Sequence, residues 1–508
     1  MSSRPRLPVL GAALATVLLA GCASVAPQSA FDDVEETLDG RVPYRVAWHT
    51  GADADQEAAA AVDRLLADSL TAEAAVQVAL LNNRRLQATY EDLGVAQAEL
   101  VQAGLLANPI FGARALWALE ESGPPDLGFN VALDFLDVFY RPLRRRVATA
   151  AYEGARYRVS SAVLDLAART RAAYVQAQAA AARLDLQRRM VQNAEAGYTA
   201  SRLLREAGNV PAVDLLAEQA LYEQARLDLL VAEGDVAERR EALTRLMGLF
   251  GEDAAYGLAG TLPPVPDAPD FPIVSASVES QTGRGERMEM GAMTEQMASA
   301  PAVFDVDAFE RAAVAASLDL AAARQDVETA AVRLGLAGAE AVLPELHAGA
   351  ELEREEGEWE LGPEAEIALP LFDQGQARRA AARAELRRAR ALYYATAVDV
   401  RSAARQLAQR LATTRRAGLH YQRVVLPLRA ELAQQTLLQY NAMQTGVFGV
   451  LQAQQMEAEA ARRYFDALAA YWEARADADL LLQGRMPDLD GAGLMLQAGG
   501  PATREAGH

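Results

Sequence analysis

Histidine, cysteine and lysine, the side chains that often carry catalysis or hold metals, are scarce in this sequence. It has one cysteine, no lysine and four widely separated histidines, His49, His347, His420 and His508. Without a lysine amine, Walker-type phosphate binding and Schiff-base chemistry are excluded. The histidines also lack the spacing of a metal site or a catalytic triad. The residues therefore predict that the chain is not an enzyme and needs no cofactor.

The single cysteine, Cys22, lies in a context that predicts lipidation. Two arginines precede an apolar segment at residues 7–20, which is too short to span a bilayer and has the length of a signal-peptide core. Small residues then lead into Cys22 as in a bacterial lipobox, in which the thiol is acylated, for example with palmitate, and the signal is removed. Ala23 after the cysteine favours the outer membrane. The alternative is a signal peptide or signal anchor that contains a cysteine by chance.

Four methionines at close spacing form a second candidate site, for a soft metal. They are Met288, Met290, Met293 and Met297. Thioethers of this kind can hold Cu(I). The alternative is an incidental cluster in a linker rich in Pro, Gly and Ser.

Composition indicates long helices and excludes one class of partner. The net charge of −20 argues against nucleic acid, because phosphate binding needs a basic patch. Aromatic residues make up only 6%, and Ala, Leu, Arg, Gln and Glu dominate, as in long helices. After the N-terminal segment no run reaches 18 apolar residues, so we expect any membrane crossing to use strands.

The sequence divides into two halves with the same order of elements, at an offset of roughly 235 residues. Each half is predicted to hold a helix, a strand hairpin, a very long helix, a turn and a returning helix. The predicted domains are a signal peptide (1–21), an N-terminal periplasmic segment (22–69), a first repeat (70–252, hairpin about 109–137), a linker (253–303), a second repeat (304–486, hairpin about 344–370) and a tail (487–508).

The predicted hairpins alternate apolar with polar residues, which is the period of a strand. Their strands are about ten residues long, enough to cross an outer membrane, but four strands cannot close a sheet alone, so several copies would pool them. In the second hairpin one face is acidic and predicts a cation-preferring lumen. The alternatives are a soluble hairpin packed on helices and glutamates that only solvate loops. The candidate lumen acids are Glu345, Glu351, Glu353, Glu358, Glu360, Glu364 and Glu366.

After each hairpin a helical run of about 65 residues is expected, at Leu143–Ala207 and Gln376–Ala442, long enough to reach roughly 100 Å. Each run ends in a turn and returns as a second helix, and Ala-rich faces let such helices pack as coiled coils. The alternative is an isolated coiled-coil scaffold.

Three segments resemble the TolC-like outer membrane efflux protein family, in its lipoprotein branch. Residues 369–373 (Leu-Pro-Leu-Phe-Asp) are similar to its strand-to-helix junction, residues 205–216 to its helical tip, and Leu70–Pro109 to its first helix. The resemblance implies a mainly α fold with a small transmembrane β part. Its duplicated long-helix coiled-coil halves, each with a two-stranded β-hairpin, would form a trimeric α-barrel/β-barrel channel.

The resemblance also implies a function and partners. The chain would be the outer-membrane channel of a tripartite efflux system, a passive gated export duct for small molecules or metal cations. Its partners would be two further copies, a periplasmic adaptor, an inner-membrane pump and outer-membrane lipid. The alternative is a lipid-anchored periplasmic scaffold or adaptor without channel activity.

Family likeness further implies a gate at the periplasmic tip. The candidate gate and tip residues are Asp214, Tyr440, Gly208 and Gly446. Met443 stands where the family usually has glycine, and Gly449 and Gln452 where acids are usual. Asp214 is equally explained as a solvated residue that a helix N-terminus favours.

Overall fold

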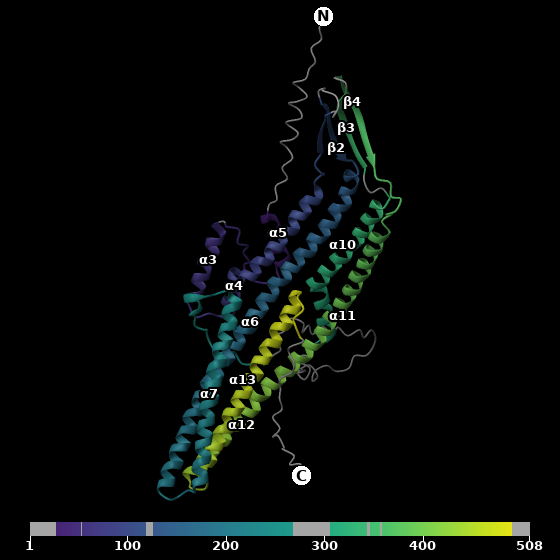
Figure 1. Cartoon of the computed structure of the whole chain (residues 1–508). Coiled ribbons are helices and arrows are strands. Elements are labelled where there is room, and N and C mark those ends of the chain that lie inside the picture. The colour runs from purple at the N-terminus through teal and green to yellow at the C-terminus, as the bar shows by residue number, and fades with distance from the viewer. Residues whose placement is uncertain are drawn as a thin grey trace, which may run out of the picture. The chain divides into compact units, whose positions relative to one another are not determined.

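The structure, a computed structural model, is mainly helical with one antiparallel sheet (Figure 1). No described helix is long and apolar enough to span a bilayer. The chain forms two compact units, and several helices run from one into the other. Unit 1 contains 27–39, Ala88–Ser160 and Leu320–Thr396, and unit 2 contains the other described residues. The structure describes residues 27–51, 53–117, 125–267, 305–342, 346–355 and 358–489.

Unit 1 is built around the sheet, whose strands are ordered β1-β2-β3-β4, each antiparallel to its neighbour. The central β2–β3 pair joins the two halves of the sequence, with Phe129 opposite Leu352 and Asn130 opposite Glu351. Within each half, β1 pairs with β2 and β3 pairs with β4, which confirms that each half holds a strand hairpin. The strands are β1 (Ile110–Leu116), β2 (Asp126–Asp134), β3 (Leu346–Glu355) and β4 (Glu358–Ile367).

Helices of unit 1 pack through an aromatic cluster near the start of the described chain. The Phe31 ring meets Tyr90 edge to face, with ring centroids 5.2 Å apart, and both rings are buried. Tyr152 donates a 2.6 Å hydrogen bond to the carboxylate of Asp33. Each buried ring of this size stabilises the unit by about 1.5–3 kcal/mol. The helices of unit 1 are α2 (Pro27–Leu38), most of α5 (Arg84–Gly104) and α10 (Leu318–Glu340), and the first parts of α6 (Asp137–Glu206) and α11 (Gln376–His420).

The long helices of unit 2 form two antiparallel pairs. In the first the rest of α6 lies beside α7, and in the second the run formed by the rest of α11, η2 and α12 lies beside α13. A π-helical turn, η2, interrupts the second long run just before Pro427, where proline removes a backbone donor. The remaining elements of unit 2 are α3 (Asp53–Leu66), α4 (Ala72–Asn82), α7 (Ala212–Met247), η1 (Gly251–Ala254), α9 (Val306–Ala316), η2 (Tyr421–Val425), α12 (Leu426–Asn441) and α13 (Val447–Gln483).

The first helix of each half is divided in two, where the sequence predicted one continuous helix. In the first half, Asn83 separates α4 from α5. Its side-chain oxygen accepts from Arg85 N and Leu86 N at 2.9 and 3.1 Å, and its amide nitrogen donates to Leu246 O at 2.8 Å. Asn83 therefore caps the new helix and binds the end of α7.

The matching break in the second half lies at Ser317, between α9 and α10. Arg41 donates from one guanidinium nitrogen to Ala316 O and Gln483 O, at 2.8 and 2.7 Å. Leu318 N donates to Gly484 O at 2.8 Å. In both halves the long returning helix thus ends against the break of the first helix, because each break exposes backbone groups that need partners.

Candidate functional site

One face of the unit 1 sheet is apolar and exposed. The strand register places Phe111, Phe129 and Trp359 on this face, and their rings stack, with centroids 6.3 Å apart for the first pair and 6.2 Å for the second. Phe111 is 66% exposed and Leu361, on the same face, is 75% exposed. A contiguous apolar surface of this kind indicates contact with lipid or with another protein.

The opposite face of the sheet is acidic. Register pairs Glu353 with Glu360 and His347 with Glu366, so these side chains share one face. Arg114 of β1 pairs with Glu353 at 2.6 Å and lies 3.8 Å from Glu351. Six of the seven candidate lumen acids share this face, and the seventh, Glu345, lies outside the described residues. The six are Glu351, Glu353, Glu358, Glu360, Glu364 and Glu366.

The two outer strands of the sheet each have a strand neighbour on one side only. β1 pairs only with β2, and β4 only with β3, among the described residues. An unpaired strand edge presents backbone N–H and C=O groups that seek partners, and in lipid these groups must be satisfied. The sheet therefore has two edges at which strands of other copies can add.

The four candidate tip residues lie at two turns of unit 2, one between α6 and α7 and the other between α12 and α13. Gly208 follows the end of α6, with φ of +77°, and Asp214 lies in the first turn of α7. Tyr440 lies in the last turn of α12, and Gly446 precedes α13 as its N-cap. The two turns have the same construction: Asn209 N donates to Leu204 O, and Gln444 N donates to Gln439 O, both at 2.8 Å. These are the hydrogen bonds of a Schellman motif.

Met443 holds the position in the second turn that Gly208 holds in the first. Its φ is +60°, and it is the one non-glycine residue with positive φ in the described part of the chain. The left-handed conformation costs an L-residue about 1–2 kcal/mol. Its side chain is 94% exposed, so no packing offsets this cost within the chain.

A pocket near these turns contains a buried carboxyl group that the sequence did not reveal. Glu218 of α7 is 6% exposed, and no hydrogen bond to it is present among the described residues. Gly197 of α6 leaves room for it, because a Cβ there would stand 2.9 Å from the carboxylate. Burial raises the pKa of Glu218. The only sequence signal is the glutamate's position four residues after Asp214 on one helix.

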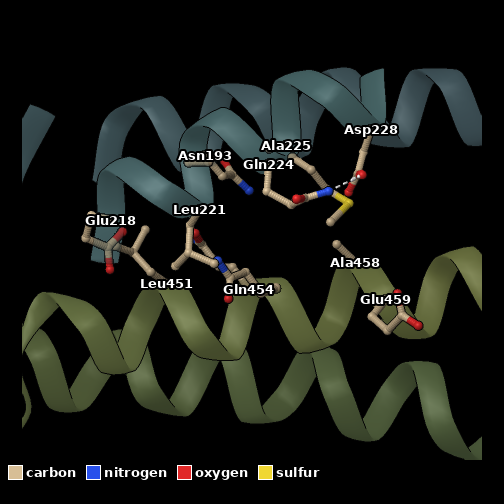
Figure 2. Close-up of a pocket in the computed structure, with 13 residues that line it drawn as sticks. Asn193, Glu218, Leu221, Gln224, Ala225, Asp228, Leu451, Gln454, Ala458 and Glu459 are labelled. Atoms are coloured by element: carbon tan, nitrogen blue, oxygen red, sulfur yellow. Dashed lines mark hydrogen bonds between the residues drawn. The ribbon is translucent and has the colours of Figure 1, made fainter. Parts of the chain in front are cut away.

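The pocket has a volume of about 240 Å³ and lies between α6, α7 and α13. Figure 2 shows Glu218 beside Leu451 at one end and Glu459 toward the other. Asp228 already accepts a 2.7 Å hydrogen bond from Gln224. Glu459 bonds to two arginines, which lower its pKa. Glu218 is therefore the acid of this pocket without a hydrogen-bond or ion-pair partner among the described residues.

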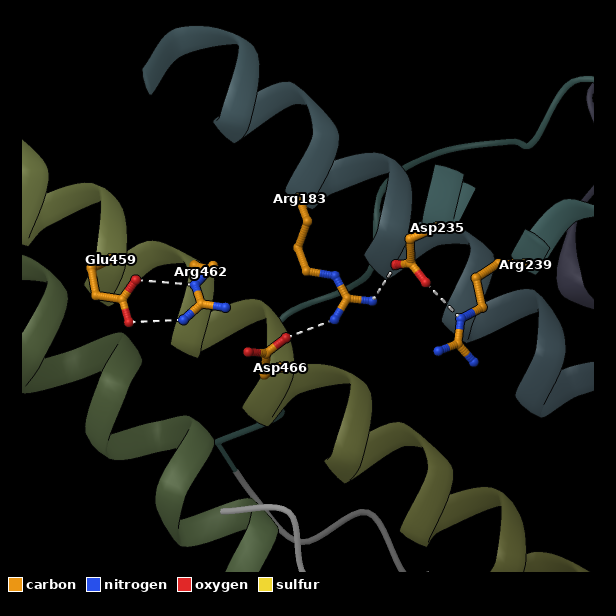
Figure 3. A network of polar contacts seen from close by, with 6 residues as sticks. All are labelled: Arg183, Asp235, Arg239, Glu459, Arg462 and Asp466. Atoms are coloured by element: carbon orange, nitrogen blue, oxygen red, sulfur yellow. Dashed lines mark hydrogen bonds and ion pairs between the residues drawn. The ribbon is translucent and has the colours of Figure 1, made fainter. Parts of the chain in front are cut away.

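A polar network holds the same three helices together (Figure 3). Arg183 of α6 donates to Asp466 of α13 at 2.8 Å and lies 3.5 Å from Asp235 of α7, which also pairs with Arg239 at 3.1 Å. Because Arg183 is mostly shielded from water, these bonds are stronger than exposed ion pairs. The network fixes the spacing of the helices that lead to the two turns.

Among the described residues, the histidines are not part of a metal site. His49 N donates to Gln87, and the His49 ring lies 3.3 Å from Arg84, so it belongs to local packing. No group of three His, Cys, Asp or Glu residues suited to a metal occurs among the described residues. Met288, Met290, Met293 and Met297 lie outside those residues, as does Cys22.

Solved outer-membrane channels have the same fold as this chain. The Campylobacter jejuni CmeC outer membrane channel is 15% identical, with a TM-score of 0.58, over 82% of this chain and 87% of its own. VceC, an outer membrane protein of Vibrio cholerae, is 16% identical, with a TM-score of 0.60, over 86% and 100%. The open state of the Neisseria gonorrhoeae MtrE outer membrane channel is 17% identical, with a TM-score of 0.60, over 81% and 88%.

Sequence comparison finds one family match, over part of the chain. A search among curated proteins finds no matching sequence. Residues 75–249, which include the first hairpin and the α6–α7 turn, match the model of the outer membrane efflux proteins. Residues 75–249 are therefore similar to the outer membrane efflux proteins, and the chain shares the fold of solved outer-membrane channels.

Proposed function

We propose that this protein is the outer-membrane channel of a tripartite efflux system and carries solutes passively from the periplasm to the exterior. The observation that carries the proposal is the sheet, with an exposed apolar face, an acidic opposite face and two open edges. A sheet in a bilayer must turn an apolar face toward the lipid and leave no strand edge unpaired, whereas the face that lines a water-filled passage must be polar. The family match supports the same function.

The working form is a homotrimer in which three sheets join edge to edge. The unpaired edges of β1 and β4 support this assembly, because joining them removes the free backbone groups. The long helices of the three copies then continue the passage into the periplasm. The family resemblance supports a trimer rather than another number of copies.

A periplasmic adaptor and an inner-membrane pump are the proposed partners, and the pump supplies the energy. The turns at Gly208 and Gly446 and the pair Asp214 and Tyr440 form the proposed gate at the periplasmic end. Crosslinking from a photoreactive residue at position 440 in cells should capture the adaptor. If only other copies of this chain are captured, the adaptor contact lies elsewhere.

Cys22 is the proposed lipid anchor. Acylation of Cys22 holds the N-terminus at the inner surface of the outer membrane, which the sequence before and after it supports. In labelled cells, radioactive palmitate should enter the wild-type chain and not the Cys22→Ser variant. Equal labelling of both would remove the anchor from the proposal.

Small molecules and metal cations are both proposed substrate classes. The six acids on one sheet face support a preference for cations. The methionine cluster supports Cu(I) as one of them, and titration of a peptide of residues 285–300 with Cu(I) tests that point. No binding would remove the copper proposal and leave the channel proposal intact.

A further inference from the structure

Arginines gather where both outgoing strands of unit 1 become helices. β2 leads into α6 and β4 leads into α11. Because neighbouring strands are antiparallel, β2 and β4 run in the same direction and finish at the same end of the sheet. Residues 138–146 and 376–390 contain ten arginines and one acid, Glu385, although the whole chain has a net charge of −20. The positive charge is thus concentrated at one level of the molecule, just past the strand ends.

Some of these arginines have structural partners and others do not. Arg144 pairs with the buried Asp137, and Arg378 lies 3.7 Å from Asp373. In contrast, no ion pair involves Arg141, Arg145, Arg146 or Arg383 among the described residues, and all four are exposed. Their charges are therefore available to a ligand.

Exposed apolar side chains lie at the same level. Phe135 and Phe139 contact each other edge to face, with ring centroids 5.6 Å apart, and are 50% and 61% exposed. Phe372, at the other junction, is 93% exposed. We call these seven residues the junction surface: Arg141, Arg145, Arg146, Arg383, Phe135, Phe139 and Phe372.

We propose that the junction surface binds the headgroups of anionic phospholipids in the periplasmic leaflet of the outer membrane. This inference rests on the proposed function, which puts the apolar sheet face in lipid. At a rise of 1.5 Å per residue, the arginines of the junction surface lie about 6–14 Å from the start of α6 and about 10 Å from the start of α11. The headgroup layer is about 5–8 Å deep, and the long, flexible arginine side chains can extend back to it.

The chemistry of the surface favours a phospholipid over other anions. A guanidinium group binds phosphate oxygens in a bidentate manner, and it is always charged. A free phosphate ion would gain nothing from the neighbouring phenylalanines, whereas an acyl chain packs against them. Aromatic side chains at such a level are typical of membrane interfaces.

The test uses the full chain in neutral detergent and short-chain lipids. Native mass spectrometry should detect phosphatidylglycerol bound roughly fivefold more tightly than phosphatidylcholine, the preference expected from one arginine near an anionic headgroup. In the variant R141Q/R145Q/R146Q/R383Q this preference should vanish. The variant R189Q/R202Q/R245Q/R416Q, which removes four exposed arginines of unit 2, should keep it.

Conductance of each variant in phosphatidylcholine bilayers is measured in parallel. If the wild type conducts but shows no preference between the two lipids, the lipid inference alone is overturned. If neither the wild type nor the variants conduct, the proposed function is overturned. Two other results would also overturn the inference. One is inorganic phosphate abolishing the preference at millimolar concentration, which indicates a free-anion site. The other is trimer loss in the junction variant with lipid preference intact, which indicates a contact between copies.

Discussion

Glu218 is the residue whose burial has a clear consequence for stability. Its folded pKa is raised by burial, so the folded chain disfavours the carboxylate. The penalty is absent below the unfolded pKa and grows as pH rises through the folded pKa. Glu218→Gln should therefore raise the unfolding temperature at pH 8, by an amount that corresponds to about 1 kcal/mol for one unpaired buried group.

The gain from Glu218→Gln should shrink as pH falls toward 4, because Glu218 then becomes mostly protonated in both states. Thermal unfolding followed by circular dichroism at pH 4 and pH 8 measures both. Glu233→Gln, an exposed acid on the same helix, is the control and should change neither. A Glu218→Gln variant that is less stable at pH 8 would contradict the argument.

The two tip glycines should respond differently to alanine. Gly208 has φ of +77°, where a Cβ is strained, so Gly208→Ala should cost about 1 kcal/mol of unfolding free energy. Gly446 has φ of −84°, and nothing lies within 4 Å of a Cβ placed there. Because Gly446 is the N-cap of α13, where glycine is preferred over alanine, Gly446→Ala should still lose some stability, but less than Gly208→Ala. Equal losses in chemical denaturation would show that flexibility, rather than conformation, selects glycine at both turns.

At the scale of elements, Asn83 connects the break between α4 and α5 to the end of α7. Asn83→Ala removes a helix cap and a partly buried hydrogen bond to Leu246, and should cost about 1–2 kcal/mol. Asn83→Ser keeps a capping oxygen and should lose less. The two variants are compared by denaturant midpoints. Identical losses would mean that capping contributes nothing at this break.

Periodicity in the sequence was sufficient to predict the strands and the long helices. Strands β3 and β4 alternate apolar and acidic residues, and the register follows from that alternation. The helix breaks were not predictable, because Asn83 and Ser317 become ends only through contacts with α7, Arg41 and Gly484. Helical propensity alone does not contain these distant partners.

The candidate sites were predictable to different degrees for the same reason. The acids of the sheet share a face because strand geometry alone places every second residue there. Glu218 was missed, since its burial depends on Gly197 in α6 and Leu451 in α13, both distant in sequence. Whether Asp214 and Tyr440 form a gate stays a prediction.

At the scale of the whole molecule, the acidic sheet face should set ion preference. Replacing Glu358, Glu360 and Glu366 with glutamine removes three charges per copy from the proposed lumen, without touching the acids that pair with Arg114. The reversal potential in a salt gradient should move toward that of a non-selective channel, because fewer fixed charges attract cations. The control E223Q/E233Q/E238Q removes three charges from α7 and should not change selectivity. An equal shift in both variants would assign selectivity to net charge instead.

The central claim is that several copies of this chain form a conducting channel, and planar-bilayer conductance of the purified protein tests it most directly, with the oligomer mass determined on the same sample. We predict discrete, cation-preferring conductance steps from a species with the mass of a trimer. A monomer that stays in aqueous solution after removal of its lipid and gives no conductance would contradict the account.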